Sequence, residues 1–305
     1  MERFDHNYTA NYVLLILTLF FLITCNQVEK GTRIKIDYMK SEYVDERNVE
    51  IWLPPSYHKN EHNKYPVIYM HDGQNLFEQA TAYGGNTWGV PETVIEYSKR
   101  GKIPEVIVVG IWNTPKRFRE YMPDKPFYMM NEKIQNVLIK EYEGEPLGDE
   151  YLKFIVNELK PMIDSTYRTK PDQKNTFIMG SSMGGLISAY AITEYPEIFR
   201  GAGCLSSHFL GSLQYNGPEF SDAFAMYFSE HLPSPKNHKY YFDYGTKTLD
   251  ALYGPHQLKV DSVMEQSGYM NGVGWVTLKF EGSDHTELSW QKRLHIPLEF
   301  LLNKN

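Results

Sequence analysis

The amino-acid sequence predicts an α/β fold in which a mostly parallel sheet, with antiparallel strands at its start, carries helices on both faces. Short, continuously apolar segments recur along the chain, and amphipathic segments with helical spacing lie between them. Of the 305 residues, 42% are hydrophobic and 23% are charged, which is the composition of a globular protein with one large core. Strands that alternate with helices favour right-handed crossovers and therefore parallel pairing.

The first two strands are expected to differ from the others. Thr32–Met39 and Val49–Leu53 alternate between apolar and polar side chains, which predicts half-buried antiparallel strands. The apolar segments predict buried strands at 66–70, 106–111, 176–179, 201–205 and 276–280, with a further strand in the segment 239–250. Helical spacing predicts helices at 151–163, 183–194, 255–266 and 286–302. In a sheet of this kind, functional residues gather in the loops that follow the carboxyl ends of the strands.

The amino terminus predicts an export signal over residues 1–25. Residues 12–24 are continuously apolar, as in a signal peptide, and fall short of the roughly 20 residues that span a bilayer. The apolar run ends at Cys25, and polar residues follow, which resembles the lipidation site of a bacterial lipoprotein. A plain signal peptide and an uncleaved anchor are the alternatives. We expect an exported protein that touches a membrane only through a lipid on Cys25, with residues 26–305 as a single domain.

Charge and cysteine content exclude several classes of function. Lys and Arg number 31 against 38 Asp and Glu, so the net charge is −7 and nucleic acid is not an expected partner. The two cysteines, Cys25 and Cys204, are too few for a disulfide scaffold or a zinc site. His58 and His62 have helical spacing but lie in a polar segment without a third ligand. We therefore do not expect a metal site.

The strongest local signal is GSSMGG at residues 180–185, between a predicted strand and a predicted helix. A sharp turn from strand to helix exposes the central serine of a G-x-S-x-G pattern, and small neighbouring residues prevent clashes around it. The helix that follows favours negative charge at its N-terminus. Although the pattern also occurs in ordinary glycine-rich turns, this context makes Ser182 the candidate nucleophile.

A serine hydroxyl needs a neighbouring base, and in the expected chain order the base comes near the carboxyl terminus. Among ten histidines, His285 follows the last predicted strand directly and precedes the last predicted helix, so it is the candidate general base. His208 also follows a strand and is a weaker rival. His295 lies inside the last predicted helix, where a surface or packing role is simpler.

The third member of such a site is a carboxylate that holds the imidazole in the correct tautomer. Asp250 lies in the loop that leaves the strand starting at Lys239, from which it could reach His285. Asp243 is the alternative, but it falls within that strand, where a structural hydrogen bond is natural.

Negative charge that develops on a carbonyl oxygen requires backbone N–H donors, one of which can be worth about 3 to 4 kcal/mol. The amide of Met183, next to the candidate nucleophile, is the first expected donor. The second is expected in the loop after the strand at 66–70, where Gly73 allows close approach of the main chain. The amide of Gln74 is the candidate there, with Gly73 as the alternative.

Taken together, these segments resemble the esterase family of α/β-hydrolases. The resemblance rests on YMHDGQNLF at 69–77, GIWN at 110–113, the GSSMGG segment, DYGT at 243–246 and HTELSW at 285–290. This family includes feruloyl and acetylxylan esterases, enterochelin esterases, S-formylglutathione hydrolases and mycolyltransferases. The resemblance implies a serine triad without metal or cofactor. It also places the acid about three residues after Gly245, where this chain has Thr248.

The expected function is therefore a serine carboxylic-ester hydrolase that acts through an acyl-enzyme on a small-molecule or glycan ester, with acetyl or feruloyl groups of carbohydrates as candidate substrates. A siderophore esterase or an acyltransferase with the same triad is the first alternative. A surface protein that binds ligands on an inactive hydrolase fold is the second.

Overall fold

The computed structural model describes residues 30–303. The predicted export signal and Cys25 lie outside the described residues. Within the described range, no helix is both long enough and apolar enough to cross a bilayer. Residues 31 onward form one compact unit.

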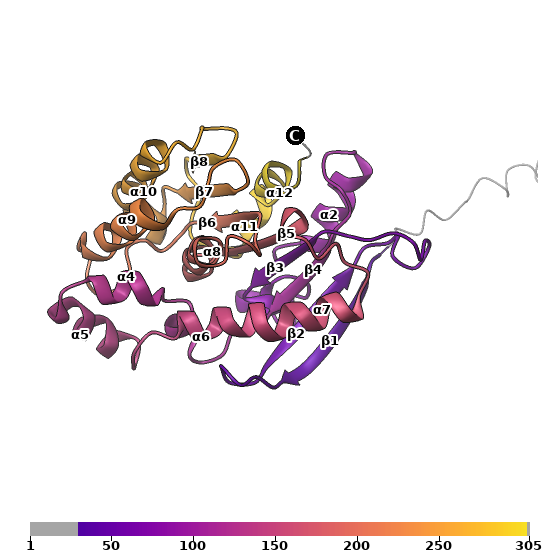
Figure 1. The fold of residues 1–305 in the computed structure, drawn as a ribbon, viewed down its shortest axis with the longest axis horizontal. Coiled ribbons are helices and arrows are strands. Elements are labelled where there is room, and N and C mark those ends of the chain that lie inside the picture. Colours follow the sequence, from indigo (N-terminus) through magenta and orange to yellow (C-terminus); the bar gives the residue numbers. More distant parts are fainter. Residues whose placement is uncertain (1–29, 304–305) are drawn as a thin grey trace, which may run out of the picture. The chain divides into compact units, whose positions relative to one another are not determined.

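The described chain forms an eight-stranded sheet in the order β1-β2-β4-β3-β5-β6-β7-β8 (Figure 1). The strands are β1 (Thr32–Met39), β2 (Arg47–Leu53), β3 (Val67–His71), β4 (Ile107–Ile111), β5 (Thr176–Ser181), β6 (Gly201–Leu205), β7 (Lys239–Gly245) and β8 (Trp275–Phe280). β1 pairs antiparallel with β2, and β2 with β4, whereas every pair from β4 to β8 is parallel. The predicted fold class, including the antiparallel start, is confirmed. The expectation that residues 49–53 are half-buried was wrong, because β2 lies between β1 and β4 and these residues are all buried.

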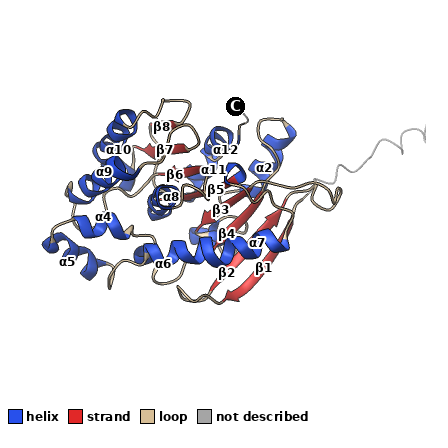
Figure 2. Cartoon of the chain, viewed as in Figure 1, coloured by secondary structure: helices blue, strands red, loops and turns tan. Residues whose placement is uncertain are grey.

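Helices cover both faces of the sheet (Figure 2). One face packs against α2 (Val90–Lys99), α11 (Glu287–Arg293) and α12 (His295–Leu302). The other face packs against the helical run that contains α6 (Gly148–Lys153) and α7 (Lys160–Thr166), and against α8 (Met183–Glu194), α9 (Glu219–His231) and α10 (Gly254–Gln266). The shorter helices α3 (Arg117–Glu120), α4 (Asp124–Met129) and α5 (Glu132–Glu141) lie between β4 and α6 in the sequence. Each face of the sheet thus has its own buried apolar cluster.

Two predicted helices differ from the structure, and a proline explains each difference. The single helix expected at 286–302 is two helices, α11 and α12, because Pro297 has no N–H to donate to the carbonyl of Arg293 and its ring crowds that carbonyl. The helix expected at 151–163 begins at Gly148 and contains a π-helical turn over Phe154–Leu159, directly before Pro161. The helices α2, α3, α4, α5 and α9 were not predicted from the sequence.

Parallel pairing brings the loops that matter to one edge of the sheet. β3, β5, β6, β7 and β8 run in the same direction, so the segments that follow them open at their common carboxyl end. The candidate site is built from these segments.

Candidate active site

Ser182 lies at the tip of the turn between β5 and α8. Its φ of 57° and ψ of −123° place a non-glycine residue in a strained conformation. Small neighbours make this turn possible, because a Cβ at Gly180 would lie 2.8 Å from the carbonyl carbon of Gly184. The N–H of Ser182 donates to the carbonyl of Leu205 at 2.9 Å, which ties the turn to the end of β6. This strained strand-to-helix turn is the geometry that exposes a nucleophilic serine.

Both expected oxyanion donors lie at the start of a helical segment. Met183 is the first residue of α8, and Gln74 lies within a 3₁₀ turn at Gly73–Asn75, so neither amide has an acceptor within its own helix. The second turn packs directly on β4, since a Cβ at Gly73 would lie 2.5 Å from the carbonyl carbon of Gly110. The close approach of this turn to the backbone of β4 therefore requires glycine at position 73.

Asp250 and His285 meet across the ends of β7 and β8. His285 Nδ1 lies 2.5 Å from Asp250 Oδ1, and the Asp250 side chain is completely buried. Asp250 Oδ2 accepts hydrogen bonds from the Gly245 amide at 2.6 Å and from the Ser206 hydroxyl at 2.7 Å. Burial raises the pKa of the Asp250 carboxyl, but the hydrogen bonds from His285, Ser206 and Gly245 outweigh it and leave the pKa below its usual value. Asp250 is thus held as a carboxylate facing the imidazole.

Asp243, the alternative acid, has other partners. Its Oδ1 lies 2.9 Å from Nη2 of Arg293, and its Oδ2 accepts from the Tyr241 hydroxyl at 2.9 Å. It lies in β7 and is fully buried. The structure therefore brings Asp250 to His285 and places Asp243 in a separate ion pair.

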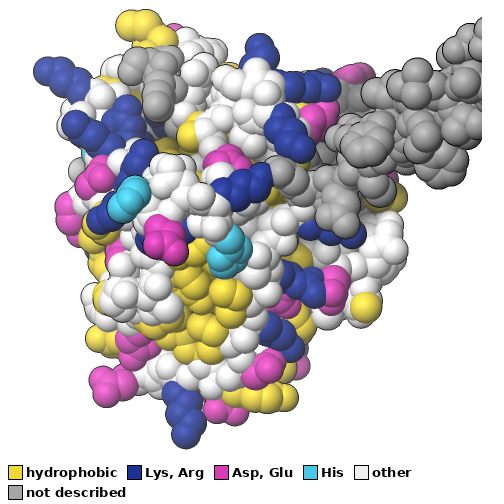
Figure 3. Space-filling model, turned by 90° about the vertical axis from the view of Figure 1, so that its right-hand side faces the viewer, with side chains coloured by type: hydrophobic (Ala, Val, Ile, Leu, Met, Phe, Trp, Pro, Cys, Tyr) yellow, Lys and Arg dark blue, Asp and Glu magenta, His cyan; other side chains and the backbone are white. Residues whose placement is uncertain are grey.

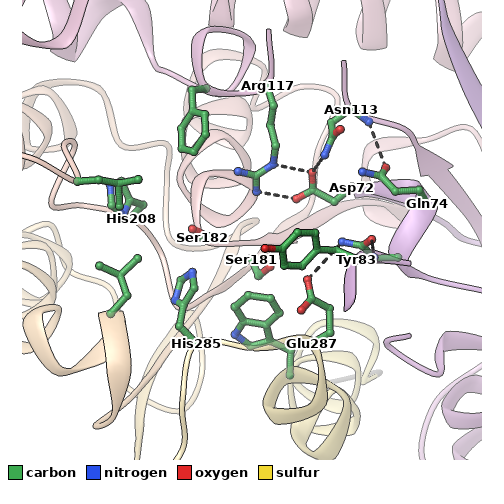
Figure 4. A pocket seen from close by; sticks show the side chains of 15 residues that line it. Asp72, Gln74, Tyr83, Asn113, Arg117, Ser181, Ser182, His208, His285 and Glu287 are labelled. Atoms are coloured by element: carbon green, nitrogen blue, oxygen red, sulfur yellow. Dashed lines mark hydrogen bonds and ion pairs between the residues drawn. The ribbon is translucent and has the colours of Figure 1, made fainter. Parts of the chain in front are cut away.

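Ser182 and His285 line the same cleft, and Figure 4 shows the imidazole directed into it on the side of Ser182. Among the described residues no hydrogen bond joins Ser182 to His285, and the Ser182 hydroxyl instead interacts with the Tyr253 side chain, whose pKa it lowers. The Tyr253 hydroxyl also lies 2.8 Å from Nδ1 of His208, and its ring meets the His285 imidazole edge-on at 5.6 Å. Tyr253 was not singled out by sequence reasoning, because nothing in the residues around position 253 marks it as close to Ser182.

His208, the weaker rival for the base, is buried rather than poised for proton transfer. Its side chain is 1% exposed, and burial lowers its pKa to about 3. It stays neutral at physiological pH.

The cleft has a volume of about 490 Å³ and carries charges of both signs. Arg117 binds Asp72 through two hydrogen bonds of 2.7 Å each, and both side chains line the cleft (Figure 4). Glu287 lies near the turn at Gly73–Asn75, where Asn75 Nδ2 donates to it at 3.3 Å. Burial raises the pKa of the Glu287 carboxyl. No group of three or more metal-ligating side chains occurs in the part of the chain that the structure describes.

The fold, together with a site at the carboxyl edge of the sheet, defines the structural class of the protein. The order of the strands, the turn at Ser182 and the positions of His285 and Asp250 on successive strand ends are those of the α/β-hydrolase fold. The family model described as "Putative esterase" matches residues 41–298. The chain belongs to this family, which confirms the resemblance seen in the sequence.

Individual relatives are more distant. The chain is 27% identical over 163 residues to uncharacterized protein YbbA of Bacillus subtilis (strain 168), an alignment that covers 53% of this chain and 57% of that protein. It is 25% identical over 251 residues to the endo-1,4-beta-xylanase/feruloyl esterase of Xylanibacter ruminicola, covering 81% of this chain and 28% of that protein. The match thus spans little more than half of the first relative and less than a third of the second.

Solved structures share the fold at low sequence identity. A ferulic acid esterase superposes with a TM-score of 0.64 at 17% identity, covering 90% of this chain and 98% of that one. An enterobactin esterase from Shigella flexneri superposes with a TM-score of 0.62 at 16% identity, covering 91% of this chain and 60% of that one. At these identities the similarity establishes the fold alone.

Proposed function

We propose that this protein is a serine carboxylic-ester hydrolase in which Ser182, His285 and Asp250 form the catalytic triad. The observation that carries the proposal is the contact between His285 Nδ1 and the buried Asp250 carboxylate, at the edge of a cleft that also contains the strained turn of Ser182. A carboxylate on Nδ1 leaves Nε2 free to accept a proton.

In the proposed mechanism, Ser182 rotates about χ1 from Tyr253 toward His285, a motion that a side chain completes on the picosecond to nanosecond scale. His285 takes the hydroxyl proton while the serine oxygen attacks the ester carbonyl. The amides of Met183 and Gln74 stabilise the oxyanion, and His285 then gives its proton to the departing alcohol. Water, deprotonated by the same imidazole, releases the acid from the acyl-enzyme.

We propose an acetyl or feruloyl ester of a carbohydrate as the substrate. Two findings support this choice. One relative is named as a feruloyl esterase, and the structure is similar to that of a ferulic acid esterase. Polar side chains on one side of the cleft, Asn75 and Glu287, could bind the hydroxyl groups of a sugar, with the exposed ring of Tyr83 beside them (Figure 4). Export by the segment 1–25, with a lipid on Cys25, would place the enzyme where such glycans occur.

The test of the triad is Ser182→Ala, assayed with 4-nitrophenyl acetate and with a fluorophosphonate probe. Wild type should turn over the ester and become labelled, whereas the variant should lose both properties and keep the circular dichroism of the fold. Ser229→Ala on the exposed surface of α9 makes the same chemical change away from the site and serves as the control. Labelling or turnover retained by the Ser182 variant would remove this serine from the mechanism. A wild type that never reacts with the probe would favour the ligand-binding alternative.

A siderophore esterase is a second candidate, because the chain shares its fold with an enterobactin esterase. A panel of acetyl, feruloyl and catecholate esters, compared by kcat/KM, separates the two candidates. An acyltransferase would instead show a faster acyl-enzyme breakdown when a carbohydrate alcohol is added.

A further inference from the structure

Ser206 follows β6 and lies beneath the proposed triad, fully buried and with a positive φ of 43°. Its hydroxyl has three partners. The oxygen lies 2.7 Å from Asp250 Oδ2, 3.0 Å from Nε1 of Trp290 and 2.9 Å from Nη2 of Arg293. No function was expected of Ser206 from its sequence context.

The chemistry of these partners fixes the direction of the hydroxyl. A serine hydroxyl has one hydrogen and two acceptor lone pairs. The indole N–H of Trp290 and the guanidinium of Arg293 can only donate, so they occupy both lone pairs. The single hydrogen must therefore point to Asp250, which accepts it as a carboxylate.

We propose that Ser206 is a positioning residue of the triad, whose hydroxyl is locked by Trp290 and Arg293 into donating to the carboxylate that orients His285. The proposal rests on the proposed hydrolase function. In this arrangement the orientation of Asp250 is set from behind by a buried network that ends at Asp243.

The network has charged groups on several elements. Asp243 of β7 neutralises Arg293 of α11, and the guanidinium also packs over the ring of Phe280 at 4.9 Å. The backbone N–H of Ser206 donates to Asp243 at 3.1 Å, so this serine bonds both buried aspartates.

Other groups face the histidine and its acid. Tyr253, directly before α10, and Trp290 of α11 contact the imidazole edge-on, at 5.6 and 5.0 Å, and Glu287 and His208 interact with it electrostatically. The substitution Ser206→Ala changes none of these side chains. A change in the pH dependence of such a variant can therefore be assigned to the lost hydrogen bond.

The direction of the effect follows from the charge on Asp250. The hydrogen bond from Ser206 stabilises the carboxylate and lowers its pKa. Without it the negative charge of the carboxylate is less dispersed and stabilises the protonated imidazole more strongly, and a protonated His285 cannot act as the base. We expect the acidic limb of the kcat/KM profile to move to higher pH.

The experiment compares Ser206→Ala with Ser207→Ala across pH 4 to 9. Ser207 is the matched control, because it is the next residue, is equally buried, and its hydroxyl has no hydrogen-bond partner among the described residues. Ser206→Ala should lower kcat/KM about ten- to a hundredfold at neutral pH, the factor expected for one hydrogen bond to a charged group. Ser207→Ala should retain the wild-type profile. An acidic limb that stays in place in Ser206→Ala would overturn the proposal.

A second variant guards against misfolding. Ser206→Gly removes the same hydroxyl, and glycine adopts the positive φ of this position without strain. Ser206→Gly should show the same shift of the acidic limb of kcat/KM as Ser206→Ala. Its thermal stability should be closer to that of wild type than the stability of Ser206→Ala.

A readout without turnover separates this proposal from the proposed function. The Nδ1 proton of His285, bonded to Asp250, should give a low-field proton NMR resonance that His285→Gln removes. The resonance should shift or vanish in Ser206→Ala and persist in Ser207→Ala, even if wild type hydrolyses none of the esters tested. Identical spectra for the two serine variants would refute the role of Ser206 and leave the hydrolase proposal intact.

Discussion

Asp250 and Asp243 are both buried aspartates that bond Ser206, yet they have different principal partners. Asp250 faces an imidazole, and Asp243 faces a guanidinium. A carboxylate that orients a histidine and one that neutralises a buried arginine respond differently to loss of charge, so matched substitutions can separate their roles.

Asp250→Asn should lower kcat by about 10³- to 10⁴-fold while leaving most of the stability, because an amide N–H facing Nδ1 selects the wrong imidazole tautomer. Asp243→Asn should instead destabilise the fold by about 3–5 kcal/mol, because Arg293 loses the charge that compensates it in the core. Stopped-assay kinetics and urea unfolding of both variants provide the measurement. The assignment of the acid is wrong if the two variants exchange these phenotypes.

At the residue scale, the sequence was informative where chain order restricts the choice. Ser182 is marked by its glycines, and His285 by its place after the last strand. Tyr253 and Ser206 could not be found in this way. Their importance comes from hydrogen bonds to residues more than 40 positions away, such as the bond between Ser206 and Asp250, and one sequence carries no signal of such contacts.

The turn that carries the proposed oxyanion donor Gln74 shows how a structural element depends on one missing side chain. The 3₁₀ turn at Gly73–Asn75 packs against β4, where a Cβ at position 73 would also lie 2.7 Å from the carbonyl oxygen of Gly110. The atoms that this Cβ would meet belong to the backbone of β4, which cannot move aside as a flexible side chain can. The position of the Gln74 amide is therefore coupled to the packing of β3 on β4.

Gly73→Ala should push this turn away from β4 and displace the Gln74 amide. We expect kcat to fall about 10²- to 10³-fold, the usual effect of losing one oxyanion donor. Gly85→Ala is a control, since a Cβ there would meet no atom within 4 Å, although its φ of 72° adds backbone strain. Steady-state kinetics with 4-nitrophenyl acetate, together with thermal melts, test the prediction. A Gly73→Ala enzyme with the kcat of wild type would show that the donor lies elsewhere.

At the element scale, strands were easier to predict than helix ends. Buried parallel strands form continuous apolar runs, and these located β3, β4, β5 and β6 within a residue or two. β8 was also located, but the expectation that it is buried was wrong, because it lies at the edge of the sheet and is mostly only partly buried. The break at Pro297 and the π-helical turn before Pro161 could have been anticipated from proline chemistry. Short helices such as α3 and α4 depend on tertiary packing, because helices of this length are marginal by themselves.

Two histidines deep in the molecule tie its stability to pH. His71 and His208 are each 1% exposed, and burial lowers the pKa of each to about 3. The unfolded chain protonates them near their usual pKa of 6.5. Between these values the unfolded state binds more protons than the native state, so the stability that neutral burial provides is lost as the pH falls from 6.5 toward 3.

His208→Gln should flatten this dependence, because glutamine remains neutral and can still bond the Tyr253 hydroxyl. Each buried histidine contributes a slope of up to about 1.4 kcal/mol per pH unit in this window. The measurement is the free energy of urea unfolding at intervals between pH 7 and 4. His231→Gln, with a side chain that is 50% exposed, is the control. Parallel curves for wild type and His208→Gln would contradict the prediction.

The surface differs from the core in its use of charge. On the face shown in Figure 3, acidic and basic side chains are interspersed around an apolar patch, so the net charge of −7 is not gathered there into a field of one sign. That face offers little long-range steering for a charged ligand. We expect the charges within the cleft to contribute more to substrate choice.

Thr248 occupies the position, three residues after Gly245, at which many esterases of this family carry their acid. It has a positive φ of 52° and accepts a hydrogen bond from the backbone N–H of His285 at 2.9 Å, while the next turn of chain presents Asp250. In the proposed triad the acid is therefore Asp250, two residues after Thr248, and it reaches the imidazole of His285. A search by alignment column would miss this candidate acid, whereas a search by distance from the imidazole finds Asp250.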